Sequence, residues 1–123
     1  MFNAECHCGN VKLAAKEPPP SLTSCNCSIC NRIGALWAYY LSERVEIESS
    51  HTNFASYSWG EKSIDFHHCT NCGCVTHYTS IRENGDRRTA INARMASPAD
   101  IDSIPVRRFD GAVSWKYLED TNA

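Results

Sequence analysis

The sequence predicts a mainly β fold with few helices, and three observations support this prediction. Short segments in which apolar and polar residues alternate recur along the chain, as expected for half-buried strands. Turn residues such as glycine and proline separate these segments. Leu, Ile, Val and Phe account for only 22 of the 123 residues, whereas eight cysteines occur in three tight groups. We therefore expect bound metal to hold the fold together in addition to a small hydrophobic core.

The individual elements follow from local patterns. Strands are predicted at residues 11–15, 36–41, 45–48, 54–59, 63–67, 75–81 and 88–95. An Asn-Gly turn at 84–85 joins the last two strands into a hairpin. The three prolines at 18–20 predict an extended loop, because successive prolines cannot join the interior of a sheet. One short helix is predicted from Pro98 to Ile104, because Ser97 is a favourable N-cap and proline suits the first helical turn.

Length and charge exclude several classes of protein. Residues 1–123 supply one ordinary domain. The net charge of −2 gives no basic field for binding nucleic acid. No apolar run approaches the roughly 20 residues that span a bilayer, and the first residues lack the segments of an export signal. We therefore expect a single cytoplasmic domain that binds neither nucleic acid nor membranes.

The cysteines are expected to bind metal rather than to form disulfides. Eight cysteines in 123 residues are less dense than in small disulfide scaffolds. Two cysteines separated by one residue can both reach the same ion, whereas a disulfide between them would be strained. Clustered thiolates in a reducing compartment favour zinc, with iron–sulfur clusters as the other metal alternative.

Two glycines indicate how the thiols divide between sites. Gly9 follows Cys8 and Gly73 follows Cys72, and a residue that tolerates positive φ lets backbone N–H groups turn toward the sulfurs. The two segments are interpreted as the two halves of one structural zinc site, which ties the N-terminus to the middle of the chain. Its predicted ligands are Cys6, Cys8, Cys69 and Cys72.

The remaining group, Cys25, Cys27 and Cys30, places three thiols within six residues. Three protein ligands with an open fourth position are typical of a catalytic zinc. The alternative is a fourth protein ligand that closes the site and makes it purely structural. The candidates for that ligand are Cys74, His67, His68 and His77.

Arginines and aromatic residues are the other candidates for binding. Basic pairs occur at 87–88 and 107–108, and a solvated surface is the alternative to a role in holding the carboxylates of a small anion. Arg32 and Arg108 are the candidates for such contacts with a thiol ligand. Aromatic side chains such as Trp37 and Tyr39 are expected in the core rather than as a platform for a ligand.

The order and spacing of the cysteines resemble those of the glutathione-dependent formaldehyde-activating enzyme family, which also includes centromere protein V. The matching motifs are C-x-C-G at 6–9, C-x-C-x-x-C-x-R at 25–32, Tyr-Ser-Trp-Gly at 57–60 and the segment 66–73 that ends in Cys-x-x-Cys-Gly. The resemblance covers approximately residues 4–95. It implies a β-tent fold of antiparallel sheets, a structural four-cysteine zinc and a second zinc at Cys25, Cys27 and Cys30.

The family's activity implies a carbon–sulfur lyase that joins glutathione, or a similar small thiol, to formaldehyde in a reversible reaction. A thiol bound to metal loses its proton and becomes a nucleophile that can attack an aldehyde carbon. The alkoxide then formed needs a proton, for which His67 and His68 are candidates. The alternatives are a non-catalytic protein-interaction module with two structural zincs, and a redox or metal-storage role for the three thiols.

Overall fold

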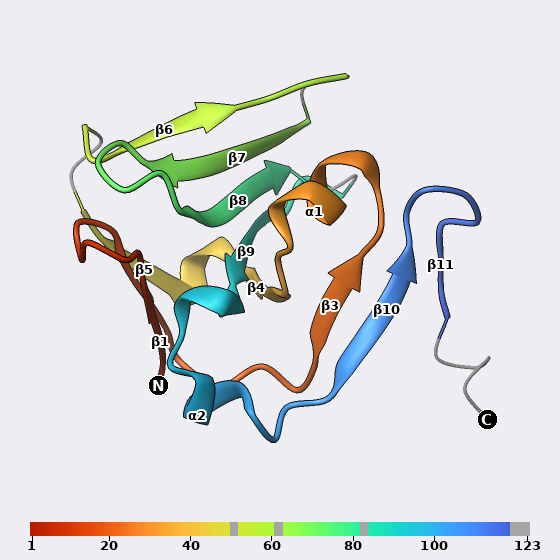
Figure 1. The fold of residues 1–123 in the computed structure, drawn as a ribbon, viewed down its shortest axis with the longest axis horizontal. Helices are drawn as coiled ribbons and strands as arrows, with labels where there is room; N and C mark the ends of the chain where they lie inside the picture. The colour runs from red at the N-terminus through yellow and green to blue at the C-terminus, as the bar shows by residue number, and fades with distance from the viewer. Residues whose placement is uncertain (50–51, 61–62, 82–83, 119–123) are drawn as a thin grey trace.

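Two β-sheets form most of the structure, a computed structural model that describes residues 1–49, 52–60, 63–81 and 84–118 (Figure 1). The smaller sheet has three antiparallel strands in the order β1-β2-β5. Its strands are β1 (Phe2–Glu5), β2 (Lys12–Ala15) and β5 (Val45–Glu48). Buried and exposed residues alternate along β1, as expected for a strand with one face on the core.

The larger sheet has eight strands in the order β11-β10-β3-β4-β9-β8-β7-β6. Its strands are β3 (Leu22–Cys25), β4 (Trp37–Leu41), β6 (Phe54–Tyr57), β7 (Ile64–Cys69), β8 (Val75–Ile81), β9 (Arg87–Asn92), β10 (Val106–Asp110) and β11 (Lys116–Tyr117). Every neighbouring pair is antiparallel except β10 and β3, which are parallel. The expected mainly β fold of antiparallel sheets is thus confirmed, with one parallel pair that makes the larger sheet mixed.

Short helices connect the strands. They are α1 (Ser28–Ile33), α2 (Pro98–Ile101) and two 3₁₀ turns, η1 (Ser42–Arg44) and η2 (Ala93–Met95). The expectation of one short helix is thus wrong by one, because α1 was not anticipated. Ser97 does precede α2, but the helix ends three residues before the expected Ile104. None of the helices in the described part of the chain has the length and apolar character needed to cross a membrane.

The two faces of the larger sheet differ. One face packs on the smaller sheet around a core that includes Phe2, Leu13, Leu22 and Ile91. The opposite face carries a second cluster built around Trp37, Phe66 and Tyr78. Figure 1 shows β6–β8 at one end of the larger sheet and β3, β10 and β11 at the other, with α1 between these ends. This second face holds the candidate site.

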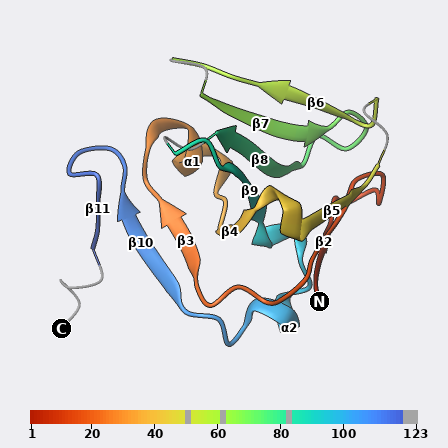
Figure 2. The ribbon, with the colours of Figure 1, turned by 180° about the vertical axis from the view of Figure 1, so that it is seen from behind.

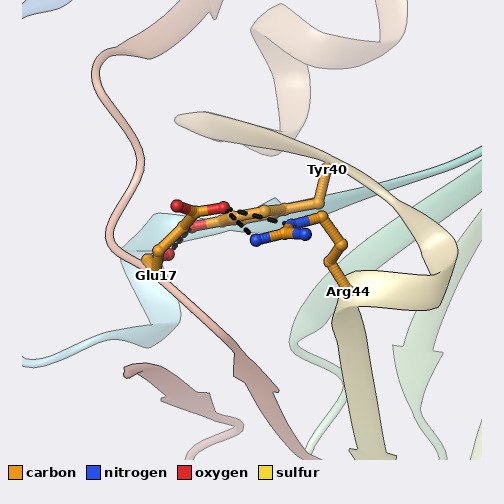
Figure 3. Close-up of polar contacts among 3 residues, drawn as sticks. All are labelled: Glu17, Tyr40 and Arg44. Atoms are coloured by element: carbon orange, nitrogen blue, oxygen red, sulfur yellow. Dashed lines mark hydrogen bonds and ion pairs between the residues drawn. The ribbon is translucent and has the colours of Figure 1, made fainter.

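A polar contact joins the two sheets at the end of β2. The Tyr40 hydroxyl donates to the Glu17 backbone carbonyl at 2.9 Å, and the Arg44 Nε donates to the Glu17 carboxylate at 3.0 Å (Figure 3). Tyr40 belongs to β4 of the larger sheet, whereas Glu17 follows β2 of the smaller one. The view from behind in Figure 2 shows β2 and β5 beside the region where β4 ends.

Most predicted strands are present with shifted ends. β5 and β8 have the predicted bounds, and the loop at 18–20 is confirmed. The segment predicted as one strand at 88–95 leaves the sheet after Asn92 and becomes the turn η2, where the Asn92 side chain accepts from the Arg94 N–H. The predicted turn at residues 60–61 falls partly outside the described residues, since only Gly60 is described.

Candidate metal centres and adjoining cleft

Four cysteines from two distant turns come together at one edge of the molecule. Cys6 and Cys8 lie in the turn between β1 and β2, and Cys69 and Cys72 lie where β7 turns into β8. Their four sulfurs lie within 4.8 Å of one another. Cys6 Sγ is 3.6 Å from Cys8 Sγ, which is 3.5 Å from Cys69 Sγ. These separations fit a tetrahedral zinc, whose sulfur ligands at about 2.3 Å from the ion would be about 3.8 Å apart.

The two turns of this four-cysteine cluster have the same construction. Gly9 and Gly73 both have positive φ, 84° and 80°, as predicted from their positions after cysteines. The turns direct backbone N–H groups at the sulfurs: Val11 N–H donates to Cys6 Sγ at 3.3 Å and Asn71 N–H to Cys69 Sγ at 3.3 Å. Such donors stabilise a thiolate, which is the form that binds a metal.

Burial raises and hydrogen bonding lowers the pKa values of different cysteines in the four-cysteine cluster. Burial raises the pKa of Cys6 to about 11. A hydrogen bond from the Cys74 backbone N–H lowers the pKa of Cys72 to about 5, and a contact with Asn71 lowers the pKa of Cys8. The cluster therefore offers both a stabilised thiolate and a buried thiol whose charge a cation would stabilise.

Three further cysteines meet where β3 ends and α1 begins. Cys25 is the last residue of β3, Cys27 is the N-cap of α1 and Cys30 lies inside α1. Their sulfurs lie within 4.8 Å of one another, and Cys27 N–H donates to Cys25 Sγ at 3.5 Å. Trp37 Nε1–H donates to Cys30 Sγ at 3.3 Å. A six-residue segment and the Trp37 indole thus hold three sulfur atoms close together as possible metal ligands.

The three-cysteine cluster is poised to carry negative charge. A hydrogen bond from the Cys30 thiol lowers the pKa of Cys25 to about 5, and the same hydrogen bond together with burial raises the pKa of Cys30. Cys30 is buried, whereas Cys25 and Cys27 are half-buried. One face of the cluster is therefore accessible, and its thiolate would attract a cation.

A cleft of about 570 Å³ adjoins the three-cysteine cluster. Cys25, Cys27 and Cys30 form part of its lining, and most of the rest is aromatic. The strand register explains why these side chains share a face. Phe66 opposes Tyr78, which opposes Ala90, which opposes Tyr39, so alternate residues of β7, β8, β9 and β4 point into the cleft.

The hairpin of β10 and β11 forms one wall of the cleft. Phe109 opposes Cys25 in the parallel pair, and Phe109 packs edge-on against Trp115 at a centroid distance of 5.1 Å. The backbone N–H of Gly111 donates to Cys25 and helps to lower its pKa. A Cβ atom at position 111 would lie 2.7 Å from Cys25 Sγ, so only glycine permits this approach.

The expected fourth ligands lie elsewhere. His67 and His77 stack at a centroid distance of 4.5 Å, and their chain neighbours Phe66 and Tyr78 line the cleft, so both histidines face the other side of the sheet. His68 does not line the cleft. Cys74 lies beside Cys72 of the other cluster. Among the described residues, no histidine or further cysteine joins the three-cysteine cluster.

The histidines are also poorly placed as proton donors. Ser56 Oγ contacts His67 Nδ1 at 2.8 Å and Thr79 Oγ1 contacts His67 Nε2 at 2.8 Å, so neighbouring hydroxyls occupy both ring nitrogens. Burial lowers the pKa of His67 and lowers that of His77 to about 3. This buried pair therefore belongs to the packing of the sheet and not to the cleft.

The arginines correct the sequence analysis. Arg32 is exposed and donates to the Ser28 carbonyl of its own helix, and Arg108 is exposed on the strand face opposite Phe109. Neither lines the cleft. Arg88 does line it, from one of the two basic pairs seen in the sequence. The structure therefore selects one arginine that the pattern alone could not distinguish from its neighbours.

Several cleft residues were missed or misassigned. Trp37 is buried in the core as expected and also borders the cleft, whereas the half-buried Tyr39 lines the cleft although the sequence analysis placed it in the core. The alternation of these residues with Ala38 and Tyr40 along β4 was a usable signal, since it assigns the two pairs to opposite faces. Gly111 had no local signal, because its role depends on pairing between distant strands.

Comparison with known proteins agrees with this geometry. No curated protein matches the chain. A crystal structure of a protein from Rhodobacter sphaeroides is similar, with a TM-score of 0.68 and 24% identity, over 85% of this chain and 99% of that chain, which supports the fold. Residues 1–103 match the family described as glutathione-dependent formaldehyde-activating enzyme. The resemblance inferred from the cysteine spacing is thereby confirmed, and the chain belongs to the glutathione-dependent formaldehyde-activating enzyme family.

Proposed function

We propose that this protein is a zinc-dependent carbon–sulfur lyase that joins a small thiol, with glutathione as the first candidate, to an aldehyde such as formaldehyde, and that the reaction is reversible. The observation that carries the proposal is the three-cysteine cluster, which has no fourth protein donor among the described residues and opens onto a cleft. A closed structural site would contain that donor.

Both clusters fit zinc by donor chemistry. Each consists of free thiols in a tight group, and none of the eight cysteines forms a disulfide. In our proposal Cys6, Cys8, Cys69 and Cys72 hold a structural zinc, whereas Cys25, Cys27 and Cys30 hold a reactive one. Zinc bound at the three-cysteine cluster would supply a position at which a substrate thiol is deprotonated at neutral pH.

The protein's own groups would orient the reactants and exclude water. Hydrogen bonds from Trp37 and Gly111 hold the sulfurs of Cys30 and Cys25 in place. The aromatic walls exclude water from the substrate, which strengthens electrostatic interactions in the cleft. In the reaction the S–H bond of the thiol breaks, a sulfur–carbon bond forms, and the carbonyl oxygen takes up a proton.

Tyr78 is the best-placed group to supply that proton. Its side chain lines the cleft that the three-cysteine cluster borders, and its ring packs edge-on against Tyr39 at a centroid distance of 6.3 Å. Burial raises the pKa of Tyr78, so the hydroxyl remains protonated at neutral pH. Tyr78 therefore replaces His67 and His68 as the proposed donor.

Cobalt substitution tests the proposal. Cobalt bound to thiolates absorbs visible light, and a change of ligand alters the spectrum. We expect two metal ions per chain, and glutathione should shift only the part of the spectrum that the Cys27→Ser variant lacks. The protein should then accelerate the exchange between free formaldehyde and its hemithioacetal with glutathione above the uncatalysed rate, measured by NMR. An unchanged cobalt spectrum over a full thiol titration would contradict thiol activation and favour the interaction module.

A further inference from the structure

The lining of the cleft beside the three-cysteine cluster is rich in aromatic side chains and, among the described residues, poor in charged ones. All three tryptophans of the chain, Trp37, Trp59 and Trp115, line it. Tyrosine and phenylalanine rings from five strands supply much of the remaining wall. Arg88 is the one cationic side chain among the described residues of the lining. A ligand that fills such a space needs a large apolar surface and few charges.

Arg88 lines the cleft and forms no ion pair with a carboxylate of the described residues. Its guanidinium lies over the Tyr39 ring, 4.3 Å from the ring centroid. Within the described residues the ion pair is that of Arg44 with Glu17, and Arg88 has none. A half-buried guanidinium without a counter-ion is a strong recognition group for a carboxylate, which it can bind through two parallel hydrogen bonds.

The distance from the thiols to Arg88 is set by β4. The Trp37 indole donates a hydrogen bond to Cys30, and the Arg88 guanidinium lies over the Tyr39 ring. These two strand residues point the same way and are separated by about 7 Å along the strand. A benzene ring with one short substituent spans a distance of this order.

We propose that the natural ligand of the cleft has an aromatic body and a single carboxylate, and that Arg88 binds the carboxylate while the opposite end faces the three-cysteine cluster. The proposal rests on the proposed function for the chemistry at that reacting end. The substrate class would therefore be an aryl carboxylate that bears a thiol or is joined to one.

Ligand binding tests the role of Arg88 without any reaction. Phenylacetate is titrated into the metal-loaded protein and its Kd is read from tryptophan fluorescence, since every tryptophan lines the cleft. Phenylacetamide is the neutral control. We expect the acid to bind about tenfold more tightly than the amide, because a charge-assisted hydrogen bond is lost with the amide.

Two neighbouring arginines give a matched pair of variants. Arg88→Met should remove the preference for the acid, and Arg88→Lys should restore part of it. Arg87→Met should leave the preference within about twofold of the wild type, because Arg87 is exposed and the alternation of β9 turns it away from the cleft. Circular dichroism and thermal melts establish that each variant is folded. If Arg88→Met does not fold, Arg88→Lys and the acid–amide ratio of the wild type decide the question.

Three outcomes would overturn the proposal: no binding of phenylacetate, equal binding of the acid and the amide, or an equal effect of the two methionine variants. The proposed function fails separately. If para-mercaptophenylacetate and glutathione both leave the cobalt spectrum unchanged, thiol activation is wrong, whereas Arg88-dependent binding of phenylacetate would still establish the carboxylate site. If glutathione shifts the spectrum and the aryl ligands do not compete with it, the aromatic substrate class is wrong.

Discussion

The two cysteine clusters differ most in how far apart their members lie in the sequence. Cys8 and Cys69 of the four-cysteine cluster are 61 residues apart. Cys8 lies in the turn between two strands of the smaller sheet, whereas Cys69 ends β7 of the larger sheet, and Cys6 and Cys69 are part of the core between the sheets. Cys25, Cys27 and Cys30 lie within six residues at the end of one strand and the start of one helix. A long-range cluster restrains the whole fold, whereas a local one restrains only its own segment.

The surroundings of the two cysteine clusters also differ, because turns enclose one cluster and a cleft adjoins the other. Turn glycines and backbone N–H groups surround the four-cysteine cluster, and the fourth thiol completes a tetrahedral set. The three-cysteine cluster opens onto the aromatic cleft, and the Trp37 indole and the Gly111 backbone N–H donate to its sulfurs. Two sets of the same ligand type can therefore differ in how much of the fold they restrain and in how accessible they are.

The largest expected effect separates the clusters by stability. Cys8→Ser and Cys69→Ser should unfold the protein or lower its melting temperature drastically, because a metal-coupled folding energy on the order of 10 kcal/mol depends on the complete ligand set. Cys27→Ser should leave a folded protein. Thermal melts of the metal-loaded proteins measure the difference.

Cys74→Ser is the matched control, because Cys74 lies beside the four-cysteine cluster without belonging to the group of sulfurs. Its melting temperature should stay near that of the wild type. Equal loss of stability in Cys8→Ser and Cys27→Ser would show that both clusters are structural, and the contrast between them would disappear.

The strands that the sequence predicted best are those whose pattern is local. Alternation alone located β5 at Val45–Glu48 and β8 at Val75–Ile81. It missed β3, where Leu22 and Thr23 are both buried and do not alternate, and α1, which has no side-chain N-cap and fewer than two turns. The strand β10 was missed because its pairing with β3 joins residues more than 80 positions apart.

The candidate site was likewise predictable only where its residues lie close together in the sequence. Cysteine spacing grouped the thiols as the structure does, since ligand geometry is largely local. The cleft could not be predicted, because Arg88 and Tyr78 come from different strands, Gly111 comes from the turn after β10, and they meet only through the sheet register. The assignment of proton donation to His67 failed for the same reason, since one register position reverses the face.

A smaller effect is expected where the hairpin touches the three-cysteine cluster. Gly111→Ala would place a methyl group 2.7 Å from Cys25 Sγ, so the hairpin or the cysteine must move. Overpacking of this kind costs about 1–3 kcal/mol. We expect the variant to stay folded but to lose metal from the three-cysteine cluster faster during mild chelation, measured as the metal content per chain over time.

Val113→Ala is the control for Gly111→Ala, because Val113 lies in the same turn and is 88% exposed. It should retain both metals like the wild type. Loss of metal from the four-cysteine cluster in Gly111→Ala, or no change in either cluster, would show that the hairpin does not support Cys25.

The smallest effect is expected at the junction of the two sheets that contains no cysteine. Tyr40→Phe removes the hydrogen bond to the Glu17 carbonyl and should lower the free energy of unfolding by about 1 kcal/mol. Arg44→Met should lower it by less than about 1 kcal/mol, because both side chains of the ion pair are more than two-fifths exposed and water screens them. Urea titrations of the metal-loaded protein at low and high salt measure both effects, and salt should diminish only that of Arg44→Met. If either variant destabilises the protein as much as Cys69→Ser does, the four-cysteine cluster is not the dominant connection between the sheets.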